Sequence, residues 1–179
     1  AEQKRAQESV AQIFAKFAGK PVEELVKDSQ AMGIGERLFG NNCAQCHGAG
    51  AAGVQGKGYP NLLDDDWLWG GDLDAIHTTV THGIRNSTDA DARYSEMPRF
   101  GVDELLDKEQ IGQVVEYVLQ LSGQDHDATK AAAGATIFAD NCSACHGPDG
   151  KGDRSQGAPN LTDAIWLYGA TREQIARTI

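Results

Sequence analysis

Apolar residues recur at helical spacing in several stretches of the chain, and no stretch alternates between apolar and polar residues as a strand would. In residues 33–42, Ile34, Leu38 and Phe39 fall on one helical face. Residues 9–17 form another amphipathic pattern, which predicts a helix that packs on the following domain or ends a membrane tether. The pattern therefore predicts an all-α protein.

The strongest helical pattern begins at Asp107. Asp107 and Gln110 have the spacing of a capping box, and Gly123 is a typical helix end. The apolar positions of this helix share one face: Ile111, Val114, Val115, Val118 and Leu119.

Glycine stands inside both of these helices, at Gly35 and Gly112. A glycine inside a helix is less favourable than alanine, so it is expected where a neighbouring element lies too close for a larger side chain. We therefore expect the two helices to cross closely, with Phe39 against Tyr117.

Two segments of the chain repeat each other at an offset of 99 residues. Residues 35–80 align with residues 134–179 without a gap, which indicates one structural unit present twice. The matches include Gly35/Gly134, Phe39/Phe138, Asn42/Asn141, Gly58/Gly157, Pro60/Pro159, Asn61/Asn160, Leu62/Leu161, Trp67/Trp166 and Gly70/Gly169. The predicted organisation is an N-terminal helical segment (1–32), a first domain (33–123) and a second domain (124–179).

The four cysteines form two C-x-x-C pairs, each followed directly by histidine. C-x-x-C-H is the attachment site of c-type haem, where two thioethers hold the porphyrin and the histidine becomes the proximal iron ligand. The sequence therefore predicts two covalently bound haem c groups. Their attachment residues are Cys43, Cys46, Cys142 and Cys145, and their proximal ligands are His47 and His146.

Three other interpretations of the cysteines are weaker. A thioredoxin-type redox pair does not require the histidine and would lie in a βαβ pattern, which the sequence lacks. In four-cysteine zinc sites the two pairs lie about 15–20 residues apart, and here they lie much farther apart. Two disulfides are also conceivable, but a bridge inside C-x-x-C is usually catalytic.

Composition supports the haem interpretation. Glycine accounts for 21 of the 179 residues and aromatic residues for only 7%, so haem would supply apolar mass that the side chains lack. The formal charge of -10 argues against binding to nucleic acid and favours a partner with a basic face.

A distal iron ligand is predicted at Met97, where Pro98 restricts the backbone beside a soft thioether ligand. Met32 is expected to pack rather than to ligate. Ligation by a second histidine stays open as an alternative, with His77, His82 and His126 as the candidates. Adding the repeat offset to Met97 points beyond Ile179, so we expect the second domain to be truncated here and the native chain to continue.

The tandem C-x-x-C-H units, the Pro-Asn-Leu and Trp-x-Trp/Tyr-Gly stretches and Met97-Pro98 resemble the class I cytochrome c fold, present twice. More narrowly, the chain resembles the dihaem subunit (subunit III) of the cbb(3)-type cytochrome c oxidases. That likeness covers nearly the whole chain and rests on the Ala-Lys-Phe-Ala segment and on residues 66–71, 157–161 and 165–169. The loop of residues 85–96 is longer than we expect in that family.

The resemblance implies roles for further residues. The carbonyls of Pro60 and Pro159 would accept a hydrogen bond from the proximal histidines, and Trp67 and Trp166 would lie along the haem or in the core. Met97 would coordinate the first haem or, if the ligands are swapped between domains, the second.

The resemblance also implies the function. The chain would pass electrons from a soluble cytochrome c with a basic face to the haem-copper catalytic subunit, beside a monohaem subunit. It would lie on the periplasmic side of the bacterial inner membrane, held by an anchor outside this sequence, and would have no catalytic centre of its own. The alternatives are a freestanding dihaem carrier, a cytochrome subunit of a dehydrogenase, and a dihaem peroxidase.

Overall fold

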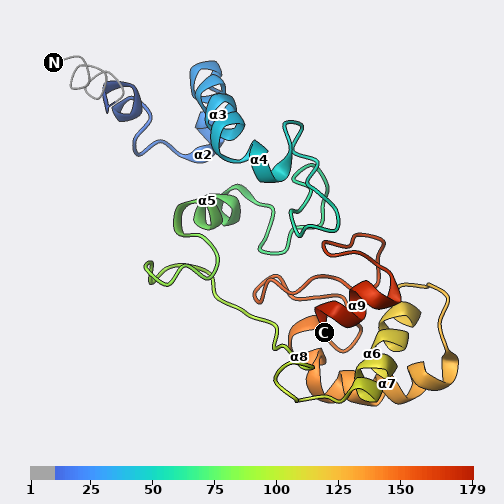
Figure 1. The fold of residues 1–179 in the computed structure, drawn as a ribbon. Helices are drawn as coiled ribbons and strands as arrows, with labels where there is room; N and C mark the ends of the chain where they lie inside the picture. The colour runs from blue at the N-terminus through green and yellow to red at the C-terminus, as the bar shows by residue number, and fades with distance from the viewer. Residues whose placement is uncertain (1–10) are drawn as a thin grey trace.

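Helices joined by long loops make up the fold of residues 11–179, which the computed structural model describes (Figure 1). The helices are α2 (Val22–Leu25), α3 (Ser29–Asn42), α4 (Ala44–His47), α5 (Leu73–His82), α6 (Lys108–Leu121), α7 (Ala128–Asn141), α8 (Ser143–His146) and α9 (Arg172–Thr178). This part of the chain has isolated bridges but no strand, so the all-α prediction is confirmed. The helix expected over residues 9–17 is helical over 11–15, and residues 1–10 lie outside the described part.

Acidic N-caps set where most of the longer helices begin. The side chains of Asp28, Asp72 and Asp127 accept backbone N–H bonds at the starts of α3, α5 and α7. At α6 both bonds of the predicted capping box form between Asp107 and Gln110.

The repeat found in the sequence is a structural repeat. Helices α3 and α7 have the same length and lie 99 positions apart, and so do the single-turn helices α4 and α8. Helices α5 and α9 begin at equivalent positions as well. The prediction of one unit present twice is confirmed.

The expected crossing of α6 on α3 is wrong, because α6 packs along α7 of the second unit. Tyr117 meets Phe138 edge to face, with 5.2 Å between the ring centroids, instead of Phe39. The close approach occurs at Gly134, which lies against the backbone of Gln113, while Gly35 has nothing near it.

Side-chain size and chain connectivity explain this choice of partner. One turn before its glycine, α7 has Ala131, which is fully buried, whereas α3 has Met32 at the equivalent position. A methyl group allows two helix backbones to approach where a methionine keeps them apart. The short connection from α6 to α7 also costs little entropy to close, in contrast to the long path from α3 to α6.

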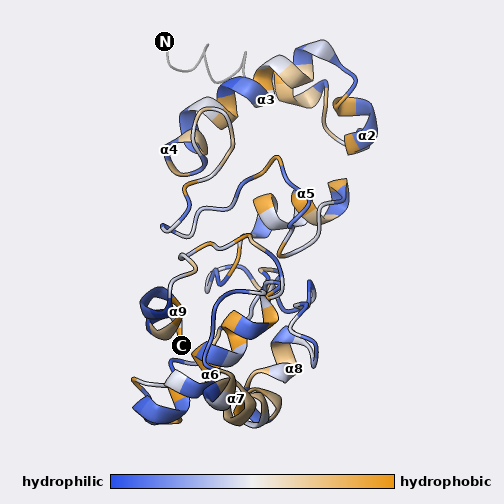
Figure 2. Cartoon of the chain, turned by 90° about the vertical axis from the view of Figure 1, so that its right-hand side faces the viewer, coloured by the Kyte–Doolittle hydropathy of each residue, from blue (hydrophilic) through white to orange (hydrophobic). Residues whose placement is uncertain are grey.

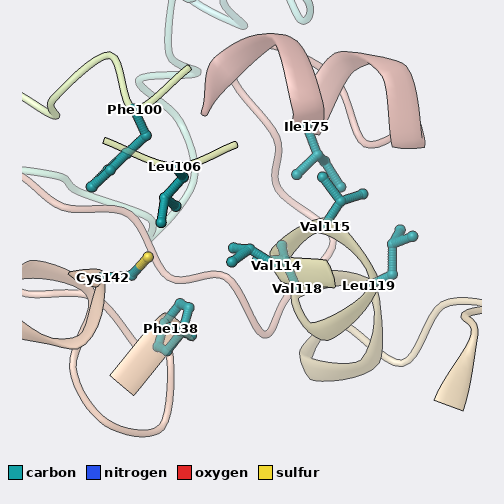
Figure 3. Close-up of a cluster of buried hydrophobic side chains, with 9 residues drawn as sticks. All are labelled: Phe100, Leu106, Val114, Val115, Val118, Leu119, Phe138, Cys142 and Ile175. Atoms are coloured by element: carbon teal, nitrogen blue, oxygen red, sulfur yellow. The ribbon is translucent and has the colours of Figure 1, made fainter. Parts of the chain in front are cut away.

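The buried core consequently lies within residues 100–179. Figure 3 shows its members, which are Phe100, Leu106, Val114, Val115, Val118, Leu119, Phe138, Cys142 and Ile175. No residue from 11 to 99 reaches the same degree of burial. Figures 1 and 2 show the corresponding arrangement, with α2–α5 toward one end of the molecule and α6–α9 at the other.

A buried carboxylate ties three helices of this core together. Glu116 of α6 is only 8% exposed. It accepts a 2.8 Å bond from Arg172 Nε of α9 and a 2.7 Å bond from the backbone N–H of Asp127, which caps α7. The Arg172 guanidinium lowers the pKa of Glu116, and burial opposes this in part.

The first prediction concerns the helix crossing. Replacing Gly134 by alanine should reduce the free energy of unfolding by about 1–3 kcal/mol, because the new methyl group meets rigid backbone of α6. The matched control is Gly35→Ala, where the space is open and the gain in helix propensity should stabilise by about 0.5–1 kcal/mol. Guanidinium unfolding of the holoprotein, followed by helical circular dichroism, measures both. The reverse order of the two effects would show that α6 packs on α3.

The second prediction concerns Glu116. Glu116→Gln should cost about 1–2 kcal/mol at pH 7, a value kept small because the Arg172 side chain is 45% exposed and water screens the pair. Since the folded-state pKa is lowered, the carboxylate stabilises the fold above the ordinary Glu pKa of 4.5, and this contribution is lost as the pH falls through the folded value. The wild type and the variant should therefore converge in stability in acid. Glu109→Gln, at the exposed start of α6, is the control, and an equal loss in both variants would contradict the prediction.

Candidate haem sites

Each C-x-x-C-H motif forms a single helical turn at the end of a longer helix. In the first unit Cys43 caps the end of α3 and starts α4, and its carbonyl accepts bonds from the backbone N–H groups of Cys46 and His47 at 3.1 and 2.9 Å. The second motif has the same turn, with distances of 3.2 and 3.0 Å. A helical turn places residues three apart on one face, so both thiols of a pair can reach the same ligand.

The two histidines are held by equivalent hydrogen bonds. His47 Nδ1 lies 3.0 Å from the carbonyl oxygen of Pro60, and His146 Nδ1 lies 3.1 Å from that of Pro159. A carbonyl oxygen can only accept, so Nδ1 carries the hydrogen and Nε2 keeps a free lone pair. That is the tautomer an axial iron ligand requires, and the two motifs therefore fit two covalently bound haem c groups.

The second site is the more buried one. His146 and Cys142 are each 9% exposed. Burial lowers the pKa of His146 more than the Pro159 carbonyl raises it, which keeps the imidazole neutral and able to ligate a metal. Burial also raises the pKa of the Cys142 thiol to about 11, so this cysteine is protonated when it is free.

The competing interpretations of the cysteines are not supported. Cys43, Cys46, Cys142 and Cys145 are all free thiols rather than disulfides. The turns α4 and α8 lie in separate parts of the molecule in both Figures 1 and 2, which excludes a single zinc site built from both pairs.

The first site is more open, and a tyrosine that the sequence analysis missed lies beside it. The Tyr59 ring meets the His47 ring edge to face with centroids 6.4 Å apart, and the neighbouring Cys46 raises the pKa of its phenol. Its position directly before Pro60 is the sequence signal, since the equivalent residue of the second unit is Ala158. The two sites therefore differ in aromatic contact as well as in burial.

The predicted tryptophans have different surroundings. Trp166 packs against the buried core, and the Trp67 ring lies against Gly71 of its own loop. Another tryptophan, Trp69, lies under the guanidinium of Arg93, with 5.6 Å between the guanidinium carbon and the ring centroid.

Met97 precedes a segment that packs in the second unit. Met97 is 39% exposed, but Phe100 and Leu106 are each only 6% exposed and belong to the core cluster that contains Cys142 (Figure 3). The expectation that Met32 packs is wrong, since it is 53% exposed.

The three candidate distal histidines have other surroundings. His82 Nδ1 pairs with Asp89 at 3.0 Å, and His126 Nδ1 lies 2.8 Å from the carbonyl of Gln124. His77 is exposed on α5.

Within residues 11–179, no helix has both the length and the apolar character needed to cross a bilayer.

Comparison with known proteins agrees with this geometry. The family model for cytochrome c matches residues 33–122 and 131–179. A cbb3-type cytochrome c oxidase subunit CcoP from Cereibacter sphaeroides is 70% identical over 149 residues, which cover 83% of this chain and 51% of that protein. The subunit FixP of Sinorhizobium medicae is 49% identical over 158 residues (86% and 53%), and the CcoP of Rubrivivax gelatinosus is 49% identical over 172 residues (96% and 52%).

The chain thus spans about half the length of the curated relatives it matches. The resemblance to subunits of cbb(3)-type oxidases, inferred from the sequence, is confirmed.

Proposed function

Because this chain belongs to the cytochrome c family, with two of its domains in tandem, we propose that it transfers electrons as a dihaem component of a cbb(3)-type cytochrome c oxidase. The observation that carries the proposal is the pair of histidines that directly follow C-x-x-C. The Nδ1 atom of each histidine is bound to a proline carbonyl. The likeness to oxidase subunits supports the choice of complex.

Each unit's own residues have defined tasks in this proposal. The cysteine pairs hold a haem c covalently, and haem c supplies one-electron redox chemistry when bound. His47 and His146 ligate the iron through Nε2. The carbonyls of Pro60 and Pro159 fix the orientation of the imidazole rings and raise their basicity. Trp67 and Trp166 line the haem pockets in this proposal. The burial of His146 excludes water from the proximal side of the second site.

Met97 is the distal ligand in this proposal, and the packing favours the second site over the first. Met97 lies three positions before Phe100, a span of about 10 Å at full extension. Since Phe100 packs in the cluster that contains Cys142, Met97 is tethered close to the second attachment turn.

The partners follow from charge and from the relatives. A formal charge of -10 favours a soluble cytochrome c donor with a lysine-rich face. The acceptor would be the haem-copper catalytic subunit, with a monohaem subunit beside it. The electrons would pass on the periplasmic side of the bacterial inner membrane.

The function is tested with a donor cytochrome c that has a lysine-rich face. We expect it to reduce the holoprotein rapidly, with a rate constant that falls about tenfold from low to physiological salt as the charges are screened. A donor cytochrome with an acidic face is the control and should react slowly at both salt concentrations. Stopped-flow absorbance measures the rates.

The assignment to the oxidase is tested by reconstitution. Adding the protein in its full-length form to a cbb(3)-type complex depleted of its dihaem subunit should restore oxygen uptake from the reduced donor. Rapid reduction without restored oxygen uptake would instead indicate a freestanding carrier.

The distal ligand is tested by spectroscopy on single-haem variants. The charge-transfer band of methionine-ligated ferric haem, at the red end of the visible spectrum, should persist when Cys43 and Cys46 are replaced by alanine. It should disappear when Cys142 and Cys145 are replaced, and also in Met97→Ala. Met32→Ala is the control and should keep the band. A band retained after loss of the second haem would place Met97 at the first.

A further inference from the structure

The two units meet through residues that are equivalent in the repeat. Gly58 and Gly157 lie 99 positions apart, and so do Trp69 and Tyr168. A Cβ on Gly58 would clash with the ring of Tyr168, and a Cβ on Gly157 would clash with the ring of Trp69. Each unit therefore places an aromatic ring on the glycine of the other, which is the reciprocal contact of a twofold pair made inside one chain.

Backbone conformation makes glycine the suitable residue at both contacts. Gly58 and Gly157 have φ values of +78° and +60°, and the absence of a Cβ lets the ring lie directly on the loop. Each glycine stands two residues before the proline whose carbonyl binds the proximal histidine. The contacts therefore lie next to both candidate haem sites.

Hydrogen bonds hold the two units together at the same place. The backbone N–H groups of Gly56 and Gly58 donate to the carbonyl of Leu167 at 2.9 and 3.0 Å. Arg154 Nη2 donates to the carbonyl of Asp65 at 3.4 Å. Arg93 lies over the Trp69 ring and holds it from within the first unit.

We propose that Gly58–Tyr168 and Gly157–Trp69 form a pseudo-twofold interface that sets the separation of the two haem sites and thereby the rate of electron exchange between them. This inference rests on the proposed function. In the exchange, one electron passes from ferrous iron at one site to ferric iron at the other, and no bond forms or breaks. The donor cytochrome supplies the electron. Electron tunnelling slows steeply with distance, so a rigid interface beside both sites gives one defined rate.

The test uses a glycine pair with a matched control. The double variant Gly58→Ala/Gly157→Ala adds a methyl group at both ring contacts. Gly56→Ala is the control, because Gly56 has a similar positive φ of +80° but open space where the Cβ of alanine would lie. Each of these substitutions strains a backbone with positive φ, and only those at Gly58 and Gly157 also push a ring away.

Two measurements on the holoprotein decide the outcome. Spin labels on cysteines introduced at the exposed positions Val80 and Asp140 report the distance between the units by pulsed electron paramagnetic resonance. Rapid one-electron reduction, followed optically, reports the exchange between the haems. We expect a single narrow distance distribution in the wild type and in the control. In the double variant we expect a broader distribution and several-fold slower exchange.

The result that overturns the proposal is an unchanged distance distribution in the double variant, or a changed distribution with unchanged exchange. If the double variant does not fold, Tyr168→Leu removes one ring from an exposed position and should show the same direction of change. These outcomes are separate from the proposed function, which fails if the full-length protein does not restore oxygen uptake.

Discussion

The close crossing of α6 and α7 at Gly134 is the contact on which the ordered core depends. Because Gly134 and Ala131 allow the two backbones to approach, the apolar face of α6 is buried against the second unit, and α9 covers its remaining side through Ile175. Phe100 and Leu106 are drawn into the same cluster. Helix α7, which precedes the haem-attachment turn at Cys142, and helix α9, which follows it, are fixed as a consequence.

This packing makes two sites with the same local chemistry unequal. Both histidines are bound by a proline carbonyl at nearly the same distance, since that bond depends on a short loop present in each unit. Burial depends on the helices around the loop, and these surround His146 but not His47. Iron in the more buried and less polar surroundings would have a higher reduction potential, because burial disfavours the extra positive charge of the ferric form.

The contact between the units is of another kind. Polar loops, backbone hydrogen bonds and two aromatic rings make it, rather than a shared apolar core. Such a contact orders the two units without merging their cores.

The sequence alone determined the features that rest on residues close together in the chain. The capping box at Asp107, the C-x-x-C-H turns and the repeat between α3 and α7 are confirmed, because their hydrogen bonds join residues three or four positions apart. Only the tertiary structure decided that α6 packs on α7, that Met97 is tethered to the second unit, and that Trp69 and Tyr168 lie on each other's glycine loops. Those outcomes depend on how the surfaces of separate helices and loops fit together. The difference between Met32 and Ala131, at equivalent positions of α3 and α7, contributes to such a fit together with the short connection from α6 to α7.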